Sequence, residues 1–184
     1  MKKFQLLAAL SLILTSVLFF SCKKDEVSDA NQSSDSSWNF GTYTYTRGTS
    51  SQTASSTGEF VAIAVTTIGS SANYGAYSGS GLTFTLHSGL GAGEYTFADL
   101  NTVVSNPTVK YIYADCTIGT AVNTGAILYG VMSPTNVKAS ITIGADGKYY
   151  ITSLNAVVLT KKVVVGNGIA GAADTYPLTI KNAY

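Results

Sequence analysis

The sequence predicts an all-β fold, an antiparallel β-sandwich of jelly-roll or immunoglobulin-like shape. From Trp38 onward, short alternating runs are separated by clusters of Gly, Ser, Asn and Pro, the pattern of many short strands joined by turns. Thr, Tyr and Val, which favour strands, are abundant, whereas the helix formers Glu, Lys, Gln and Arg are scarce. Only 11% of the 184 residues are charged, so the surface must be rich in uncharged hydroxyl groups.

Ten runs are candidate strands. Leu82, Phe84 and Leu86 are apolar and the residues between them are polar, which is the two-residue period of a half-buried strand. Asp146-Gly147 separates two such runs and predicts a hairpin turn, so the strands on either side are antiparallel. The candidate strands are residues 40–46, 59–67, 82–87, 94–97, 109–114, 126–132, 137–143, 148–154, 156–161 and 175–181.

The connections between these runs are mostly too short for the crossover that parallel strands require, so we expect no parallel sheet. Residues 99–104 fit one helical turn. Residues 38–184 form the predicted domain, and a chain of this length buries roughly two thirds of its surface. The core therefore needs no disulfide bond.

The first 21 residues have the features of a secretion signal. Lys2 and Lys3 precede an apolar run over residues 6–20, which matches the charged and apolar regions of a signal peptide. The run has 15 residues, fewer than the ~20 that span a bilayer. Residues 22–37 follow as a small, polar segment without apolar periodicity, which predicts a flexible linker.

The Ser21-Cys22 pair at the end of the apolar run resembles the lipobox of bacterial lipoproteins. The resemblance implies that the Cys22 thiol carries a diacylglyceryl group, that the bond between Ser21 and Cys22 is cut, and that the new amino group is acylated, for instance with palmitate. Phe19 and Phe20 depart from the usual Leu and small residue of that motif. The alternative is an incidental cysteine after an ordinary signal peptide.

The sequence CKKDE at residues 22–26 resembles the start of lipoproteins from the Bacteroidetes group, in which such an acidic-containing stretch is associated with export to the cell surface. The segments ITIGADGKYYITSLNAVVLTKK and TYPLTIKNAY resemble the ends of small uncharacterised lipoproteins of that group. The resemblance implies a lipid anchor in the outer membrane and surface exposure. It brings no activity with it.

The composition argues against several classes of function. Without Lys2 and Lys3 the chain has nine basic and ten acidic residues, a net charge of about −1, and no basic patch for nucleic acid. His87 is the only histidine, which excludes a multi-histidine zinc site, and it falls on the polar face of its run, where we expect an exposed strand-end residue. Two roles are open for Cys116, a buried small hydrophobe or a reactive thiol.

We predict no catalytic, cofactor-binding or metal-binding residue. The glycine-rich loops around Gly81 and Gly91 lack the strand-to-helix context that phosphate loops and nucleophile elbows require. A glycoside hydrolase needs two carboxylates on either side of the scissile bond, and here the acidic residues are scattered singly. Those of the predicted domain are Glu59, Glu94, Asp99, Asp115, Asp146 and Asp174.

Tyrosines are the candidate ligand platform. Tyr43 and Tyr45 lie two residues apart, as do Tyr111 and Tyr113, so each pair projects from one face of its strand. Solvent-facing rings would bind glycans or peptides, and the alternative is that they are core residues with hydrogen-bonded hydroxyls.

The sequence therefore predicts a non-catalytic binding or adhesion module that is attached to the membrane through its lipid anchor and has a glycan or a protein as its ligand. One alternative is a self-assembling, fimbria-like subunit that pairs through strand edges, which Lys161 and Lys162 would oppose as edge protectors. A hydrolase is the third class, and it requires converging carboxylates.

Overall fold

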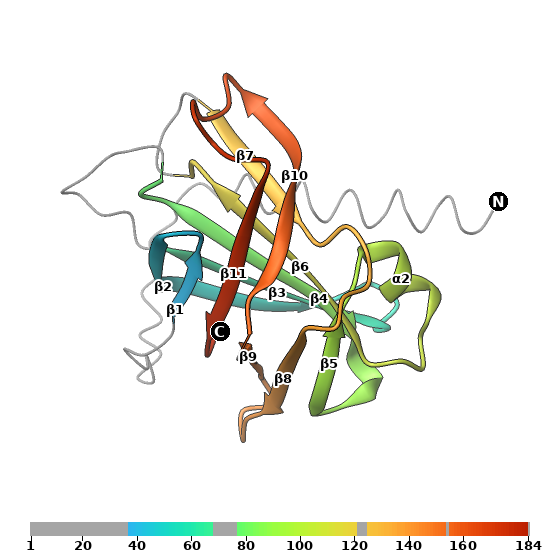
Figure 1. Ribbon diagram of the computed structural model, residues 1–184. Coiled ribbons are helices and arrows are strands. Elements are labelled where there is room, and N and C mark those ends of the chain that lie inside the picture. The colour runs from blue at the N-terminus through green and yellow to red at the C-terminus, as the bar shows by residue number, and fades with distance from the viewer. Residues whose placement is uncertain (1–36, 68–76, 121–124, 154, 184) are drawn as a thin grey trace. The chain divides into compact units, whose positions relative to one another are not determined.

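The computed structural model describes residues 37–67, 77–120, 125–153 and 155–183, which belong to one compact unit, Ser33–Tyr184. The predicted signal peptide, Cys22 and the linker up to residue 36 lie outside these residues. The described residues confirm the all-β class, with eleven strands in one mixed sheet (Figure 1). The elements are β1 (Ser37–Phe40), β2 (Tyr43–Ala54), β3 (Phe60–Thr67), β4 (Ser80–His87), η2 (Ser88–Leu90), β5 (Gly93–Phe97), α2 (Leu100–Ser105), β6 (Tyr111–Ile118), β7 (Gly125–Gly130), β8 (Lys138–Ile143), β9 (Tyr149–Ser153), β10 (Val157–Gly166) and β11 (Thr175–Lys181).

Each predicted run overlaps a strand, and the first run overlaps two. Gly41, with a φ of 63°, breaks residues 40–46 into the end of β1 and the start of β2, because glycine adopts this left-handed conformation without steric cost. The far half of β2 is polar and shows no alternation of apolar residues. It is a strand because it pairs with β3, from Arg47 opposite Thr67 to Ala54 opposite Val61.

Eight strands form a closed circuit. The order β4-β3-β2-β1-β11-β10-β7-β6 is completed by an antiparallel pairing between β6 and β4, and every neighbouring pair in the circuit is antiparallel. The sheet thus folds back on itself and encloses its apolar face in a sandwich-like arrangement. Around the circuit the strands follow chain order, without the crossing connections of jelly-roll and immunoglobulin topologies.

Two excursions leave this circuit. The first, between β4 and β6, contains β5 and α2, and the second, between β7 and β10, contains the β8–β9 hairpin. β5 pairs with β6 in parallel, with Thr96 opposite Tyr111 and Phe97 opposite Ile112. This pairing of two residues departs from the otherwise antiparallel arrangement of the described strands. Residues 98–110 provide a long connection that contains α2 and satisfies the crossover requirement.

The circuit has two ends. Ser37 pairs with Lys181, so the first described residue and the end of β11 lie together, near the label C in Figure 1. At the opposite end, Gly41 donates its backbone N–H to Pro177, and Gly119 donates to Gly79. We call this second end, formed by the β1–β2 turn, the start of β4, the end of β6 and loop 167–174, the distal end.

The core fills the circuit with inward-facing aromatic and aliphatic side chains. Trp38, Phe40 and Phe84 are fully or almost fully buried. The Trp38 indole N–H donates to the Ser80 hydroxyl over 3.3 Å, and the Cys116 sulfur also lies 3.3 Å from that oxygen. The Ser80 hydroxyl is thus the common partner of the Trp38 indole N–H from β1 and the Cys116 sulfur from β6.

A tyrosine cluster at the distal end

The four predicted platform tyrosines do not share one surface. Tyr43 and Tyr45 lie on the inward face of the sheet, because they are opposite the core residues Phe40 and Trp38. Tyr113 lies on the outward face of β6, since it is three residues from Cys116, whose sulfur lies beside the Ser80 hydroxyl in the interior. The two predicted pairs therefore come from opposite faces of the sheet.

Half of the predicted platform is also buried. Tyr45 is 4% exposed and stacks on Trp38 with a centroid distance of 5.6 Å, and Tyr113 is 2% exposed. The expectation of solvent-facing rings is wrong for these two residues, because the closed sheet and the side chains around them cover both rings. Tyr43 and Tyr111 are half-buried.

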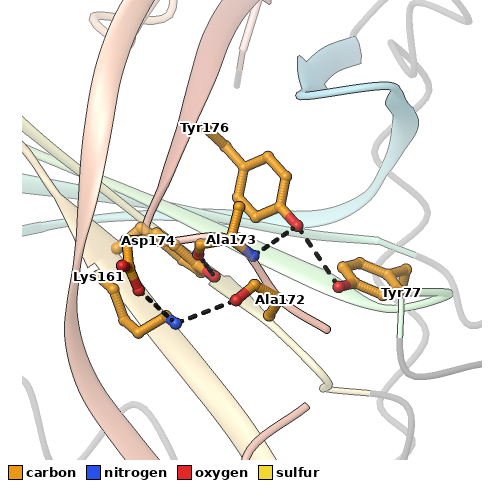
Figure 2. Close-up of polar contacts among 7 residues, drawn as sticks. Tyr77, Lys161, Ala172, Ala173, Asp174 and Tyr176 are labelled. Carbon is orange, nitrogen blue, oxygen red and sulfur yellow. Dashed lines mark hydrogen bonds and ion pairs between the residues drawn. The ribbon is translucent and has the colours of Figure 1, made fainter. Parts of the chain in front are cut away.

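Around Tyr43 the structure instead assembles a different set of tyrosines. The Tyr43 and Tyr77 rings stack almost in parallel, with centroids 4.2 Å apart and an interplanar angle of 6°. The Tyr45 hydroxyl donates to the Tyr77 carbonyl oxygen over 2.9 Å. The hydroxyl oxygens of Tyr77 and Tyr176 lie 3.4 Å apart, as Figure 2 shows. Three rings, Tyr43, Tyr77 and Tyr176, are thereby joined while each keeps some exposure; we call them the tyrosine cluster.

Tyr176 connects the cluster to the core and to loop 167–174. Its ring contacts Phe40 and Tyr129, with centroid distances of 5.0 and 5.4 Å. Its hydroxyl accepts the Ala173 N–H over 3.1 Å, and the Tyr129 hydroxyl donates to the Ala173 carbonyl over 2.9 Å. The backbone N–H and the carbonyl of Ala173 are thus both hydrogen-bonded to tyrosine hydroxyls.

An ion pair borders the cluster. The Lys161 ammonium lies 2.9 Å from the Asp174 carboxylate and donates to the Ala172 carbonyl over 3.1 Å (Figure 2). Asp174 is largely exposed, whereas Lys161 is mostly covered. The pair holds loop 167–174 against β10 and cancels the two charges beside the tyrosines.

Tyr77 of the cluster and its neighbours Tyr45 and Tyr129 are uncharged near neutral pH. Burial, reinforced by neighbouring phenols, raises the pKa of Tyr77 and Tyr45 above their ordinary value. Burial likewise raises the pKa of Tyr129 to about 12. The site therefore offers aromatic faces and neutral hydroxyls that donate and accept hydrogen bonds. These properties suit the binding of a neutral polar ligand.

The sequence did not indicate that Tyr77 lies beside Tyr43. Tyr176 and Tyr129 were not predicted as part of a site, because they come from strands β11 and β7, far from Tyr43 and Tyr77 in the chain. The closed circuit brings these strands to the same end of the sheet. No local pattern in the sequence carries that information.

His87 and Cys116 are both buried. The expectation of an exposed His87 is wrong, since its side chain is 7% exposed, its Nε2 lies 2.9 Å from the Val103 carbonyl of α2, and its ring packs on Phe60. The excursion through α2 covers what would otherwise be the polar face of β4. For Cys116, burial raises the pKa to about 12, which fits a small core residue and not a reactive thiol.

Most carboxylates of the described residues have local structural partners. Asp99 accepts from the Thr102 N–H as the N-cap of α2, and Glu94 pairs with Lys138 over 2.8 Å. Asp146 accepts from the Lys148 N–H in the β8–β9 turn. These contacts assign each of the three a role in the fold.

Asp115 is different, because it is buried on the outward face of β6. It is 3% exposed, and its Oδ2 has no hydrogen-bond partner among the described residues. Burial raises its pKa from 3.8 to about 7, although Lys162 and the hydroxyls of Tyr113 and Thr83 act to lower it. Sequence reasoning noted this residue only as one of several scattered acids.

Among the described residues, no three metal-ligating side chains converge, and no helix has the length and apolarity needed to cross a membrane. Comparisons of the chain with protein-family models, with curated proteins and with solved structures gave no match.

Proposed function

We propose that this chain is a non-catalytic binding module, attached to the outside of the cell envelope through a lipid on Cys22, and that its tyrosine cluster binds an uncharged saccharide. The observation that carries the proposal is the joined set of half-buried rings, Tyr43, Tyr77 and Tyr176, at the distal end.

The chemistry of the cluster supports a sugar as the ligand. The C–H faces of a sugar ring pack on aromatic faces, while its hydroxyls need partners that both donate and accept. Tyrosine provides both in one side chain. The Lys161–Asp174 pair leaves no net charge beside the rings, which favours a neutral saccharide over a charged one.

The position of the cluster supports a role as a binding site that faces away from the membrane. Ser37, the last residue of the predicted linker, lies at the end of the circuit opposite the cluster. A ligand at the distal end therefore meets the domain away from its point of attachment. This placement suits a module that captures soluble or cell-bound glycans.

The proposal is tested by calorimetric titration of the full chain, in detergent micelles, with neutral gluco-, manno- and galacto-oligosaccharides. Tyr77→Ala removes the ring that stacks on Tyr43 and meets Tyr176, and we expect it to weaken binding about tenfold, the effect of losing ~1.4 kcal/mol of ring contact. Tyr150→Ala is the matched control, because Tyr150 belongs to the β8–β9 hairpin and bonds to Asp146. Equal affinities of all three proteins, or no binding to any sugar, would overturn the assignment.

A further inference from the structure

The outer part of β10 has three consecutive exposed valines. Val163, Val164 and Val165 are 47%, 53% and 55% exposed. On one side they pair with Leu128, Ile127 and Ala126 of β7. On the other side, the pairing of β10 with β11 covers Val157–Thr160 and ends with the Lys161 N–H bond to the Asp174 carbonyl. Within the described part of the chain, no strand pairs with this side of residues 162–166.

No described strand covers this edge, because the loop that follows β10 turns inward. Ile169 is 9% exposed, and its Cδ1 lies 3.2 Å from the position that a Cβ on Gly119 would take. The backbone of Gly168 also packs closely on Gly125, because a Cβ added to Gly125 would lie 2.5 Å from the Gly168 nitrogen. Glycines thus let the loop pack into the distal end. The chain that would otherwise continue alongside β10 leaves its valines uncovered, at the tip of β10 near the top of Figure 1.

The two lysines before the valines do not protect the edge from pairing with another strand. Lys161 turns to Asp174 and the Ala172 carbonyl. Lys162 occupies an irregularity in the pairing of β10 with β7, donates to the Tyr113 hydroxyl over 2.8 Å, and lies 4.9 Å from the centre of that ring. Lysines protect strand edges when their charges project from the edge, and both of these charges are directed elsewhere.

We propose that a second copy of this chain pairs with the edge, antiparallel, about a two-fold axis at Val164. Val164 then faces Val164 of the second copy, Val163 faces Val165, and Lys162 faces Gly166. Each β-branched residue meets another across the strands, which is a favourable cross-strand pairing. A parallel arrangement in the same register sets Lys162 beside Lys162, and like charges directly opposite one another are destabilising. Charge therefore selects the antiparallel arrangement.

The same geometry limits the assembly to two copies. A two-fold interface uses the same surface on both partners and is closed once formed. The edge thus yields a dimer and not the open polymer that a fimbria-like subunit requires. The inference is independent of the sugar site, because the edge and the tyrosine cluster share no side chain.

Disulfide cross-linking tests the register. In an antiparallel pair, opposite Cα atoms are about 4.5–5.5 Å apart, within the range that a disulfide bridges. We expect Val164→Cys in the full chain, in native membranes under mild oxidation, to give a covalent dimer at least about tenfold more abundant than Val158→Cys gives. Val158 is the matched control, since it is 57% exposed on the same strand but lies where β11 pairs. Cys116 is buried and does not compete.

Two further variants keep the test decisive. Val163→Cys should cross-link poorly alone, because its partner in this register is Val165; efficient cross-linking would indicate a parallel pairing and overturn the proposal. The unmodified chain should give a dimer with a chemical cross-linker that does not react with amines. Val164→Lys should abolish this dimer. If Val164→Cys reacts with a soluble maleimide, and so is accessible, yet forms no more dimer than Val158→Cys, the proposal is wrong.

Discussion

At the scale of single residues, Asp115 has the least ordinary environment. Its carboxyl is buried with an unpartnered Oδ2, and its pKa rises to about 7 because burial disfavours the charged form. The charged or polar groups around it are Lys162 of β10, Tyr113 of β6 and Thr83 of β4. The folded state holds this proton at pH values at which the unfolded chain has already released it. The stabilising contribution of this group is therefore complete below pH 3.8 and is lost as the pH rises through about 7.

Asp115→Asn should remove this pH dependence. At pH 8 we expect the variant to be more stable than the unmodified protein, by up to about 4 kcal/mol, since each pKa unit corresponds to about 1.4 kcal/mol. At pH 4 the two proteins should be similar, because the native carboxyl is then protonated. Urea unfolding at both pH values measures the difference. Equal slopes of the unfolding free energy against pH would show that Asp115 is not the group responsible.

At the scale of elements, the β1–β2 turn links the backbone to the tyrosine cluster. Gly41 has a positive φ, and a Cβ at this position would lie 2.6 Å from Cδ1 of Tyr176. The turn therefore requires glycine for two reasons, the left-handed backbone conformation and the close approach of a ring. Tyr176 in turn holds loop 167–174 through its hydrogen bond with Ala173. The ring of Tyr176 therefore links the β1–β2 turn to this loop.

Gly41→Ala should destabilise the protein by roughly 2–3 kcal/mol, of which about 1 kcal/mol comes from the backbone and the rest from displacement of the ring. Gly58→Ala is the matched control, because Gly58 has a φ of 71° and no atom lies within 4 Å of its added Cβ. The difference between the two urea midpoints isolates the ring contact. Equal losses of stability would mean that Tyr176 moves aside without cost.

At the scale of the whole molecule, the chain closes on itself through its ends. β1 and β11, the first and last described strands, pair antiparallel over four residue pairs, from Ser37 with Lys181 to Phe40 with Leu178. The C-terminal strand is therefore part of the closed circuit, and its Tyr176 is part of the cluster. Pairs this far apart in sequence are costly to form early, so we expect the circuit to close late in folding.

The proposed lipid anchor concerns the whole molecule as well, because it would determine where the domain is held. Cys22→Ser removes the thiol that the lipobox resemblance marks for modification. We expect the variant to lack the acyl mass of the native protein in intact-mass spectrometry and to leave the membrane fraction for the soluble one once its signal is cleaved, since the chains supply about 0.8 kcal/mol per buried methylene. A mass that differs only by the exchange of sulfur for oxygen, together with unchanged fractionation, would identify Cys22 as incidental.

Local patterns in the sequence determined most of the secondary structure of the described residues, although the far half of β2 is a strand only through its pairing with β3. Period-two alternation marked the strands, and Asp146-Gly147 marked the β8–β9 turn, where Gly147 has a φ of 73° and donates to the Gly144 carbonyl. Residues 99–104 were predicted as a helical turn, and α2 occupies Leu100–Ser105 behind its N-cap Asp99. These features depend on steric and hydrogen-bonding preferences of neighbouring residues, which the sequence displays directly.

Only the tertiary structure decided which faces are buried and which strands are neighbours. Tyr43 and Tyr45 alternate as a strand on the protein surface would, yet they face the interior because the circuit closes over them. His87 is on the polar face of β4, yet α2 covers it. Tyr77 and Tyr176 meet although 99 residues separate them. Alternation identifies two faces of a strand but not what each face meets, because that depends on long-range pairing between strands.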